Sequence, residues 1–102
     1  MANKVVINLA TGMEDAERVT VAFLVGGAAT GKGKQVAMFL TKDAVRLALP
    51  GHAEGGGELL VCPICFNSRK LDEADLVPNA RIAGATPLWE WIGDDAATVF
   101  SY

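Results

Sequence analysis

The sequence is short of the residue types on which several large classes of function depend. Of its 102 residues, nine are Lys or Arg, one is His and two are Cys. The basic residues are scattered and the formal net charge is −3, whereas nucleic-acid binding needs clustered positive charge. A structural zinc site normally takes four protein ligands, a number that this chain reaches only if several chains share the site. We therefore expect no nucleic-acid partner and no bound metal.

Long apolar runs are also missing. The longest, residues 19–29, is about half of the roughly 20 residues that a membrane-spanning helix requires. The opening residues lead directly into the strand-like segment Val5-Val6-Ile7 and show no secretory signal. These absences predict a cytoplasmic protein without a membrane partner. Because the cytoplasm is reducing, both cysteines are expected to be free thiols.

The sequence does contain a regular alternation of strand-like and helix-like segments. A length of 102 residues suits a single domain over residues 1–102. The strand-like segments are continuous apolar runs, which are typical of parallel strands covered on both faces. With helix-like segments between them, they predict an α/β fold with a five-stranded, mostly parallel, doubly wound sheet. The predicted strands are residues 5–9, 36–40, 58–61, 80–83 and 97–100.

Local signals predict where the helices begin. The acidic pair Glu14-Asp15 suits the first turn of the first helix, where negative charge complements the helix dipole. Thr41 or Asp43 is a suitable cap for a short helix after the second strand. Thr86-Pro87 predicts the start of the last helix, with Thr as N-cap and Pro at the first helical position.

Two features favour self-association. Hydrophobic residues make up 51% of the chain, a high share for a domain of this size. The first predicted helix carries Val19 and Phe23 on one side and Val21 and Leu24 on another, so it is apolar nearly all round. A helix of that kind needs cover on more than one side, and we expect a homo-oligomer to supply it.

Cys62-Pro63-Ile64-Cys65 is the strongest chemical signal. It follows the third predicted strand, and the functional crevice of parallel α/β sheets lies at the carboxyl ends of the strands. Proline at the first helical position makes Cys62 the N-cap, whose sulfur then meets the unpaired amides of the helix start; this environment favours the thiolate. Cys65 lies one turn further and is a candidate resolving thiol. The alternative is that both cysteines are small buried hydrophobes.

Two other patterns have weaker chemical interpretations. Residues 26–32 (GGAATGK) resemble part of a phosphate-binding P-loop, but Gly33 stands where Ser or Thr should hold magnesium, and the segment leads from helix to strand. We therefore expect no nucleotide and no other cofactor. Thr11-Gly12 follows the first strand at the same sheet edge as Cys62, and it is either a substrate-contacting pocket wall or a plain turn.

Together these features resemble the DsrE family of small sulfur-relay proteins over nearly the whole chain. The most specific stretch has a cysteine after the third strand, followed seven residues later by Arg69. Lys70 stands where the family often has glycine. The segments that carry the resemblance are residues 11–15 (TGMED), 33–40 (GKQVAMFL) and 62–69 (CPICFNSR).

The resemblance implies a three-layer Rossmann-like fold with strand order 4-3-2-1-5 that assembles as dimers, trimers or hexamers. It places Cys62 at the position of the cysteine that carries sulfur as a persulfide, with Cys65 matching a second cysteine found in some branches. Sulfur donor and acceptor proteins are the partners expected for such a relay. The candidate substrate contacts are Arg69, whose charge suits an anionic persulfide, and Thr11 and Gly12 at the same sheet edge.

Two hypotheses of function follow. In the first, Cys62 accepts sulfane sulfur and passes it on, as a sulfurtransferase or sulfur carrier, with Cys65 as resolving thiol. In the second, the chain is a non-catalytic binding or assembly module whose cysteines only pack. A dithiol redox switch lies between the two.

Overall fold

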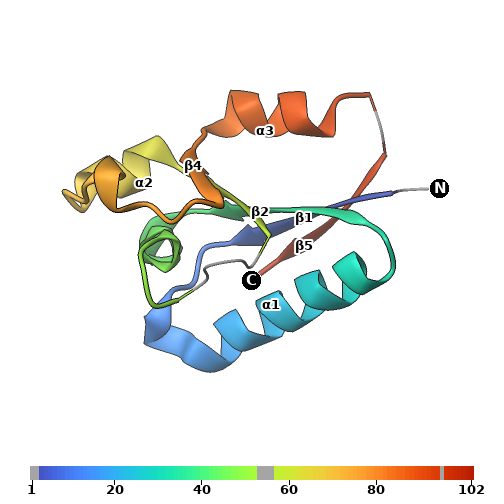
Figure 1. The fold of residues 1–102 in the computed structure, drawn as a ribbon, viewed down its shortest axis with the longest axis horizontal. Coiled ribbons are helices and arrows are strands. Elements are labelled where there is room, and N and C mark those ends of the chain that lie inside the picture. Colours follow the sequence, from blue (N-terminus) through green and yellow to red (C-terminus); the bar gives the residue numbers. More distant parts are fainter. Residues whose placement is uncertain (1–2, 53–56, 95) are drawn as a thin grey trace.

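A sheet of five strands forms the centre of the molecule (Figure 1). The computed structural model describes residues 3–52, 57–94 and 96–102. All strand pairs are parallel, and their spatial order is β4-β3-β2-β1-β5. This confirms the predicted fold class and the strand order that the family resemblance implied. The strands are β1 (Lys4–Leu9), β2 (Gln35–Leu40), β3 (Glu58–Val61), β4 (Ala80–Ile82) and β5 (Ala97–Ser101).

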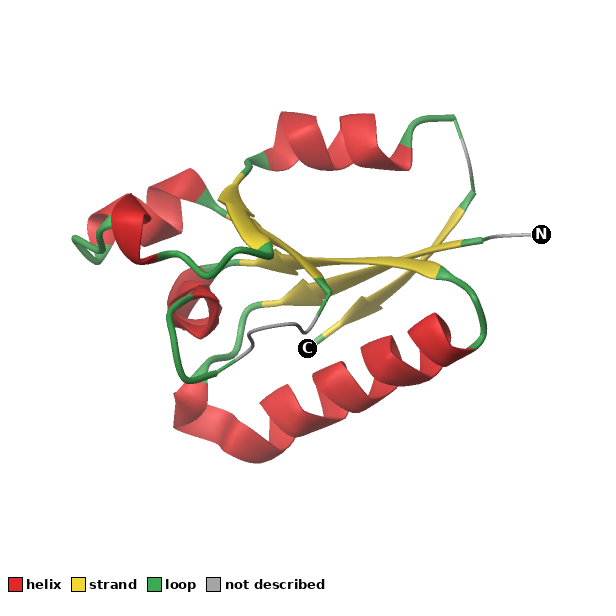
Figure 2. Cartoon of the chain, in the orientation of Figure 1, coloured by secondary structure: helices red, strands yellow, loops and turns green. Residues whose placement is uncertain are grey.

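Helical segments connect these strands and cover the sheet, with α1 on one face and α3 on the other (Figures 1 and 2). Over the described residues, no helix is long and apolar enough to cross a membrane. The α-helices are α1 (Ala16–Gly31), α2 (Pro63–Ser68) and α3 (Ala85–Ile92), and the short 3-10 helices are η1 (Met13–Asp15), η2 (Lys42–Ala48) and η3 (Glu73–Asp75).

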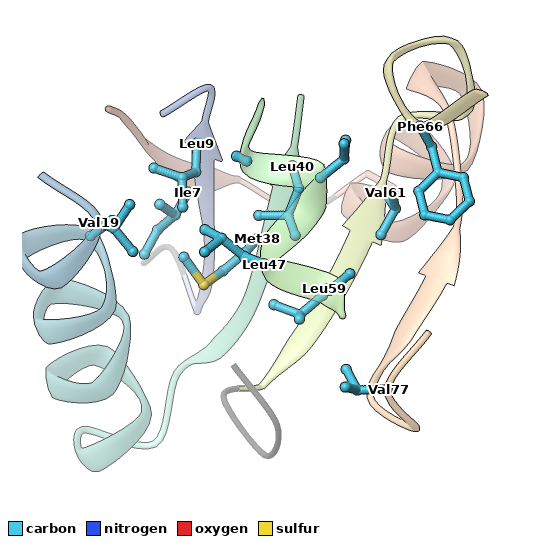
Figure 3. Packing of buried hydrophobic residues seen from close by; sticks show 14 of the residues in the cluster. Ile7, Leu9, Val19, Met38, Leu40, Leu47, Leu59, Val61, Phe66 and Val77 are labelled. Carbon is cyan, nitrogen blue, oxygen red and sulfur yellow. The ribbon is translucent and has the colours of Figure 1, made fainter. Parts of the chain in front are cut away.

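The core divides into two parts because successive strand residues point to opposite faces of the sheet. The larger part lies on the α1 face, where Ile7, Met38 and Leu59 from three neighbouring strands are fully buried (Figure 3). The smaller part lies on the other face, where Leu60 is buried and Trp91 of α3 packs against it. Both faces of β3 are therefore covered, and its carboxyl end is held in a fixed place.

The starts of the first two helical segments agree only in part with the sequence prediction. Glu14 and Asp15 lie in the separate short helix η1, and Asp15 then caps α1 by accepting a hydrogen bond from the Arg18 amide. Thr41 is the N-cap of η2 but makes no capping hydrogen bond with its side chain, and Asp43 lies inside η2.

The start of α3 also differs, because Gly84 is its N-cap and Pro87 is its third residue. A proline is tolerated there because the first amides of a helix have no intrahelical partner.

The edge strand β5 departs from the expectation that both faces of every strand are covered. Four of its five residues are exposed, among them Val99 and Phe100, which are 58% and 39% exposed. On α1, the side of Val21 and Leu24 is open as well. The apolar surface that the sequence predicted to need cover therefore remains uncovered in the single chain.

Candidate functional site

The carboxyl edge of the sheet holds the predicted site residues. Main-chain pairing continues one residue past the end of the strands: the Cys62 amide donates to the Leu40 carbonyl at 3.0 Å, and the Ala83 amide donates to the Val61 carbonyl at 2.9 Å. Cys62 thus lies between the ends of β2 and β4. On the β4 side, a Cβ built on Gly84 would lie 3.7 Å from the ring of Pro63, so the N-cap of α3 lies beside the start of α2.

Cys62 is the N-cap of α2, as the sequence predicted, and Pro63 is at the first helical position. The Cys62 backbone is extended, with φ −61° and ψ 120°, and its carbonyl accepts the first helical hydrogen bond from the Phe66 amide at 3.0 Å. Its side chain makes no capping hydrogen bond. The predicted hydrogen bond from the helix amides to the Cys62 sulfur is therefore not formed, although the N-cap position itself is confirmed.

The two cysteines have different surroundings. Both are free thiols and both are partly exposed. Cys65 packs against the large core together with buried Phe66, the next residue of α2. Ile64, between the cysteines, is 78% exposed. One turn of helix therefore presents a partly exposed thiol at its start, a thiol against the core, and an apolar side chain directed to solvent.

Arg69 is the C-cap of α2, at the opposite end of the helix from Cys62. Its guanidinium donates to the Asp43 carboxylate at 3.2 Å and to the Cys65 carbonyl at 3.1 Å. Asp43 also accepts from Arg46 at 3.0 Å. Arg69 is only 26% exposed, so its ion pair fixes α2 to η2. Asp43 and Arg46 are the residues of this cluster that the sequence did not assign to the site.

The Thr11-Gly12 turn reaches the same cluster from β1. Thr11 is buried, and the Gly12 amide donates to the Glu14 carboxylate at 2.7 Å. A Cβ on Gly12 would lie 2.7 Å from the Asp43 carbonyl oxygen, so this turn touches the backbone of η2. The structure therefore joins Gly12 to Arg69 through Asp43, while Cys62 lies on the far side of β2 from Thr11. Whether Thr11, Gly12 or Arg69 contacts a substrate stays a prediction.

The Asp43 carboxylate provides a pH-dependent test of this cluster. Hydrogen bonds from Arg46 and, second, from Arg69 lower the pKa of Asp43 below its usual value. An Asp whose pKa is lower in the folded state than in the unfolded state stabilises the fold above the unfolded value of about 3.9, and this contribution is lost as the pH falls through the folded pKa. Asp43→Asn should therefore lower the urea midpoint at pH 7, and the gap to wild type should shrink below about pH 4. An equal gap at pH 7 and pH 3 would contradict the assigned ion pairs.

The described part of the chain has no group of three or more His, Cys, Asp or Glu side chains arranged to hold a metal ion. A cavity of about 430 Å³ lies between α1 and η2, and its lining includes Met13, Phe23, Leu47 and His52 but neither cysteine. At the carboxyl edge, α2 carries two thiols near its start, and the Asp43 carboxylate pairs with two guanidinium groups near its end.

Comparison with solved structures supports the resemblance for the fold. No protein-family model matches the chain, and no curated protein matches it. Among solved structures, the crystal structure of the YchN protein from E. coli superposes with a TM-score of 0.77, covers 100% of both chains and shares 17% sequence identity. Identity at that level shows the fold alone. The chain is thus a small α/β protein with the DsrE-like, Rossmann-like fold.

Proposed function

We propose that the protein handles sulfane sulfur as a persulfide on Cys62. The observation that carries the proposal is the placement of Cys62: a partly exposed thiol without a capping hydrogen bond, at the carboxyl edge of the sheet, with a second free thiol three residues further on. Ligands of parallel α/β sheets bind at this edge. The DsrE-like fold and the cysteine-to-arginine spacing of residues 62–69 support the same function.

Loading and delivery are thiol exchange reactions. The Cys62 thiolate attacks the outer sulfur of a donor persulfide, the donor S–S bond breaks, and the donor leaves as a thiolate while Cys62 carries the new S–S bond. An acceptor thiolate then attacks that outer sulfur, and Cys62 leaves as the thiolate. No net oxidation occurs in either step. Sulfur donor and acceptor proteins are the proposed partners, and the exposed Ile64 beside Cys62 offers them an apolar contact.

Cys65 provides a second outcome. Its thiolate attacks the inner sulfur, which is bonded to Cys62; the Cys62–Cys65 disulfide forms and hydrosulfide leaves. Restoring the two thiols then requires a dithiol reductant. The packing of Cys65 against the core disfavours rapid attack, so we assign Cys62 the carrier role and Cys65 an accessory role.

Intact-mass spectrometry after incubation with inorganic polysulfide tests the proposal. Wild type should gain about 32 Da per sulfur atom, located on Cys62 by peptide mapping. Cys62→Ser should load at least about tenfold less, while Cys65→Ser should load as wild type does and retain the sulfur longer. Wild type unfolded in urea is the control for ordinary thiol reactivity, and it should load Cys62 more slowly than the folded protein.

Two results would contradict persulfide handling. If Cys62→Ser loads as much sulfur as wild type, the carrier is not Cys62. If folded and unfolded wild type load at the same rate, the fold does not activate the thiol, and the non-catalytic binding module becomes the better description. A loss of about 2 Da without any loaded species would instead indicate a dithiol redox switch.

A further inference from the structure

The outer edge of the sheet at β5 has the composition of a strand that pairs with another strand. Ala97–Ser101 reads ATVFS, with no charged residue and no proline. Isolated proteins usually protect an edge with charges, proline or a bulge, because an unprotected edge pairs with other chains. The pairing of β5 with β1 is regular from Lys4↔Ala97 to Asn8↔Ser101. Over these described residues, β5 therefore has no bulge that would protect its edge.

The hydrogen bonds of Tyr102, the residue that follows β5, show which backbone groups of the strand face outward. The Tyr102 amide donates to the Asn8 carbonyl, and the Tyr102 carbonyl accepts from the Ala10 amide. Residue 102 therefore turns both of its main-chain groups toward β1. Because this direction alternates along a strand, Thr98 and Phe100 also face β1. The amides and carbonyls of Ala97, Val99 and Ser101 then face away from the sheet.

These outward groups are complementary to themselves. In an antiparallel pair of two β5 strands centred on Val99, Val99 lies opposite its own copy and Ala97 lies opposite Ser101. All of these residues have amides and carbonyls that face outward. Each of the three pairs (99 with 99, 97 with 101 and 101 with 97) therefore exchanges two hydrogen bonds, about six in total. On the intervening positions Thr98 lies opposite Phe100, a cross-strand contact between a β-branched and an aromatic side chain.

We propose that two copies of the chain dimerise by antiparallel pairing of their β5 strands about Val99. The dimer has a two-fold axis through that residue, and one sheet of ten strands runs through both chains. Pairing covers the outer flank of Val99, which is 58% exposed in the single chain, and places no like charges opposite each other within β5. A second copy fits this edge because its register is the one that uses every outward-facing group of the strand.

The proposed dimer keeps the two Cys62 sites separate. Three strand spacings of about 4.8 Å lie between β3 and β5, and the antiparallel arrangement directs the carboxyl edges of the two sheets in opposite directions. Each Cys62 therefore works within its own chain. Dimerisation and sulfur loading are independent, and either proposal can fail without the other.

Val99→Pro is the sharpest test, because the amide it removes faces the partner and not β1. Thr98→Pro is its matched opposite: the lost amide belongs to the β1–β5 ladder, so this variant should lose stability. By sedimentation equilibrium over the micromolar range, wild type should be a dimer. Val99→Pro should raise the dissociation constant at least about a hundredfold and leave polysulfide loading of Cys62 unchanged.

A second variant keeps the proposal testable if Val99→Pro fails to fold. Val99→Lys places two positive charges opposite each other at the two-fold axis and should give a folded monomer by circular dichroism. Val99→Thr, which keeps the backbone pairing and the β-branched shape, should remain dimeric. A monomeric wild type, or a dimer that survives Val99→Lys, would overturn the proposed interface.

Discussion

Phe66→Ala is expected to lower the free energy of unfolding by about 3–5 kcal/mol, the usual cost of removing a fully buried aromatic ring. Phe66 is 1% exposed and belongs to the large core, although it lies on the short helix α2 (Figure 3). A helix of six residues has little stability of its own, because nucleation is costly. Packing of Phe66 against the core therefore holds α2 in place, together with the ion pair between Arg69 and Asp43.

Ile64 provides the matched control on the same helix. It is also a large apolar residue, but it is 78% exposed, so Ile64→Ala should change the free energy of unfolding by no more than about 0.5 kcal/mol. Phe66→Leu keeps most of the apolar volume and should cost less than Phe66→Ala. Urea unfolding followed by circular dichroism measures all three. Equal losses for Ile64→Ala and Phe66→Ala would show that α2 is not anchored through its buried face.

The Phe66 variant also tests the site. The Phe66 amide donates to the Cys62 carbonyl, and Cys65 packs against the same core as the ring. Loosening α2 should expose Cys65 more than Cys62, because Cys65 is the thiol that the core covers. Alkylation by iodoacetamide should therefore prefer Cys62 in wild type and lose that preference in Phe66→Ala. An unchanged ratio of the two alkylated cysteines would contradict the unequal roles assigned to them.

The sequence was sufficient to predict the strands and the position of Cys62, because both depend on local signals. Apolar runs define the buried strands, and proline after Cys62 defines the helix start. Strand order has no such local signal, since pairing partners are distant along the chain. The order β4-β3-β2-β1-β5 was predicted only from the family resemblance, which the segments around Thr11 and Cys62 carry.

Other features depended on tertiary contacts and were missed for that reason. Thr86-Pro87 is a good start signal, yet α3 begins two residues earlier, where Gly84 is its N-cap and lies beside Pro63 of α2. Asp43 was predicted only as a cap, and its ion pair with Arg69 spans 26 residues of sequence. Residue type alone could have indicated it as an acid after the second strand, at the same edge as Cys62.

Gly12→Ala is expected to cost about 1–3 kcal/mol of folding free energy, the typical cost of inserting a methyl group into a closely packed place. The new Cβ would lie 2.7 Å from the carbonyl oxygen and 2.9 Å from the carbonyl carbon of Asp43. Both are backbone atoms, so rotation of a side chain does not relieve the overlap and η2 has to shift. Because the Asp43 carboxylate holds Arg69, the shift should be transmitted to α2.

Gly27→Ala is the control for the loss of a glycine. Gly27 lies in α1 with open space where a Cβ would be placed, so alanine there should stabilise the protein by about 0.5–1 kcal/mol. The unfolding midpoints of the two variants should therefore move in opposite directions. In Gly12→Ala, the dependence of stability on pH below about 4 should also weaken, because displacement of η2 lengthens the Asp43–Arg69 ion pair.

If Gly12→Ala is as stable as wild type, the Thr11-Gly12 turn does not pack tightly against η2, and the proposed coupling of this turn to α2 through Asp43 is wrong. If stability falls but the acid dependence stays intact, the overlap is absorbed within the turn, and Arg69 keeps its position independently of Gly12.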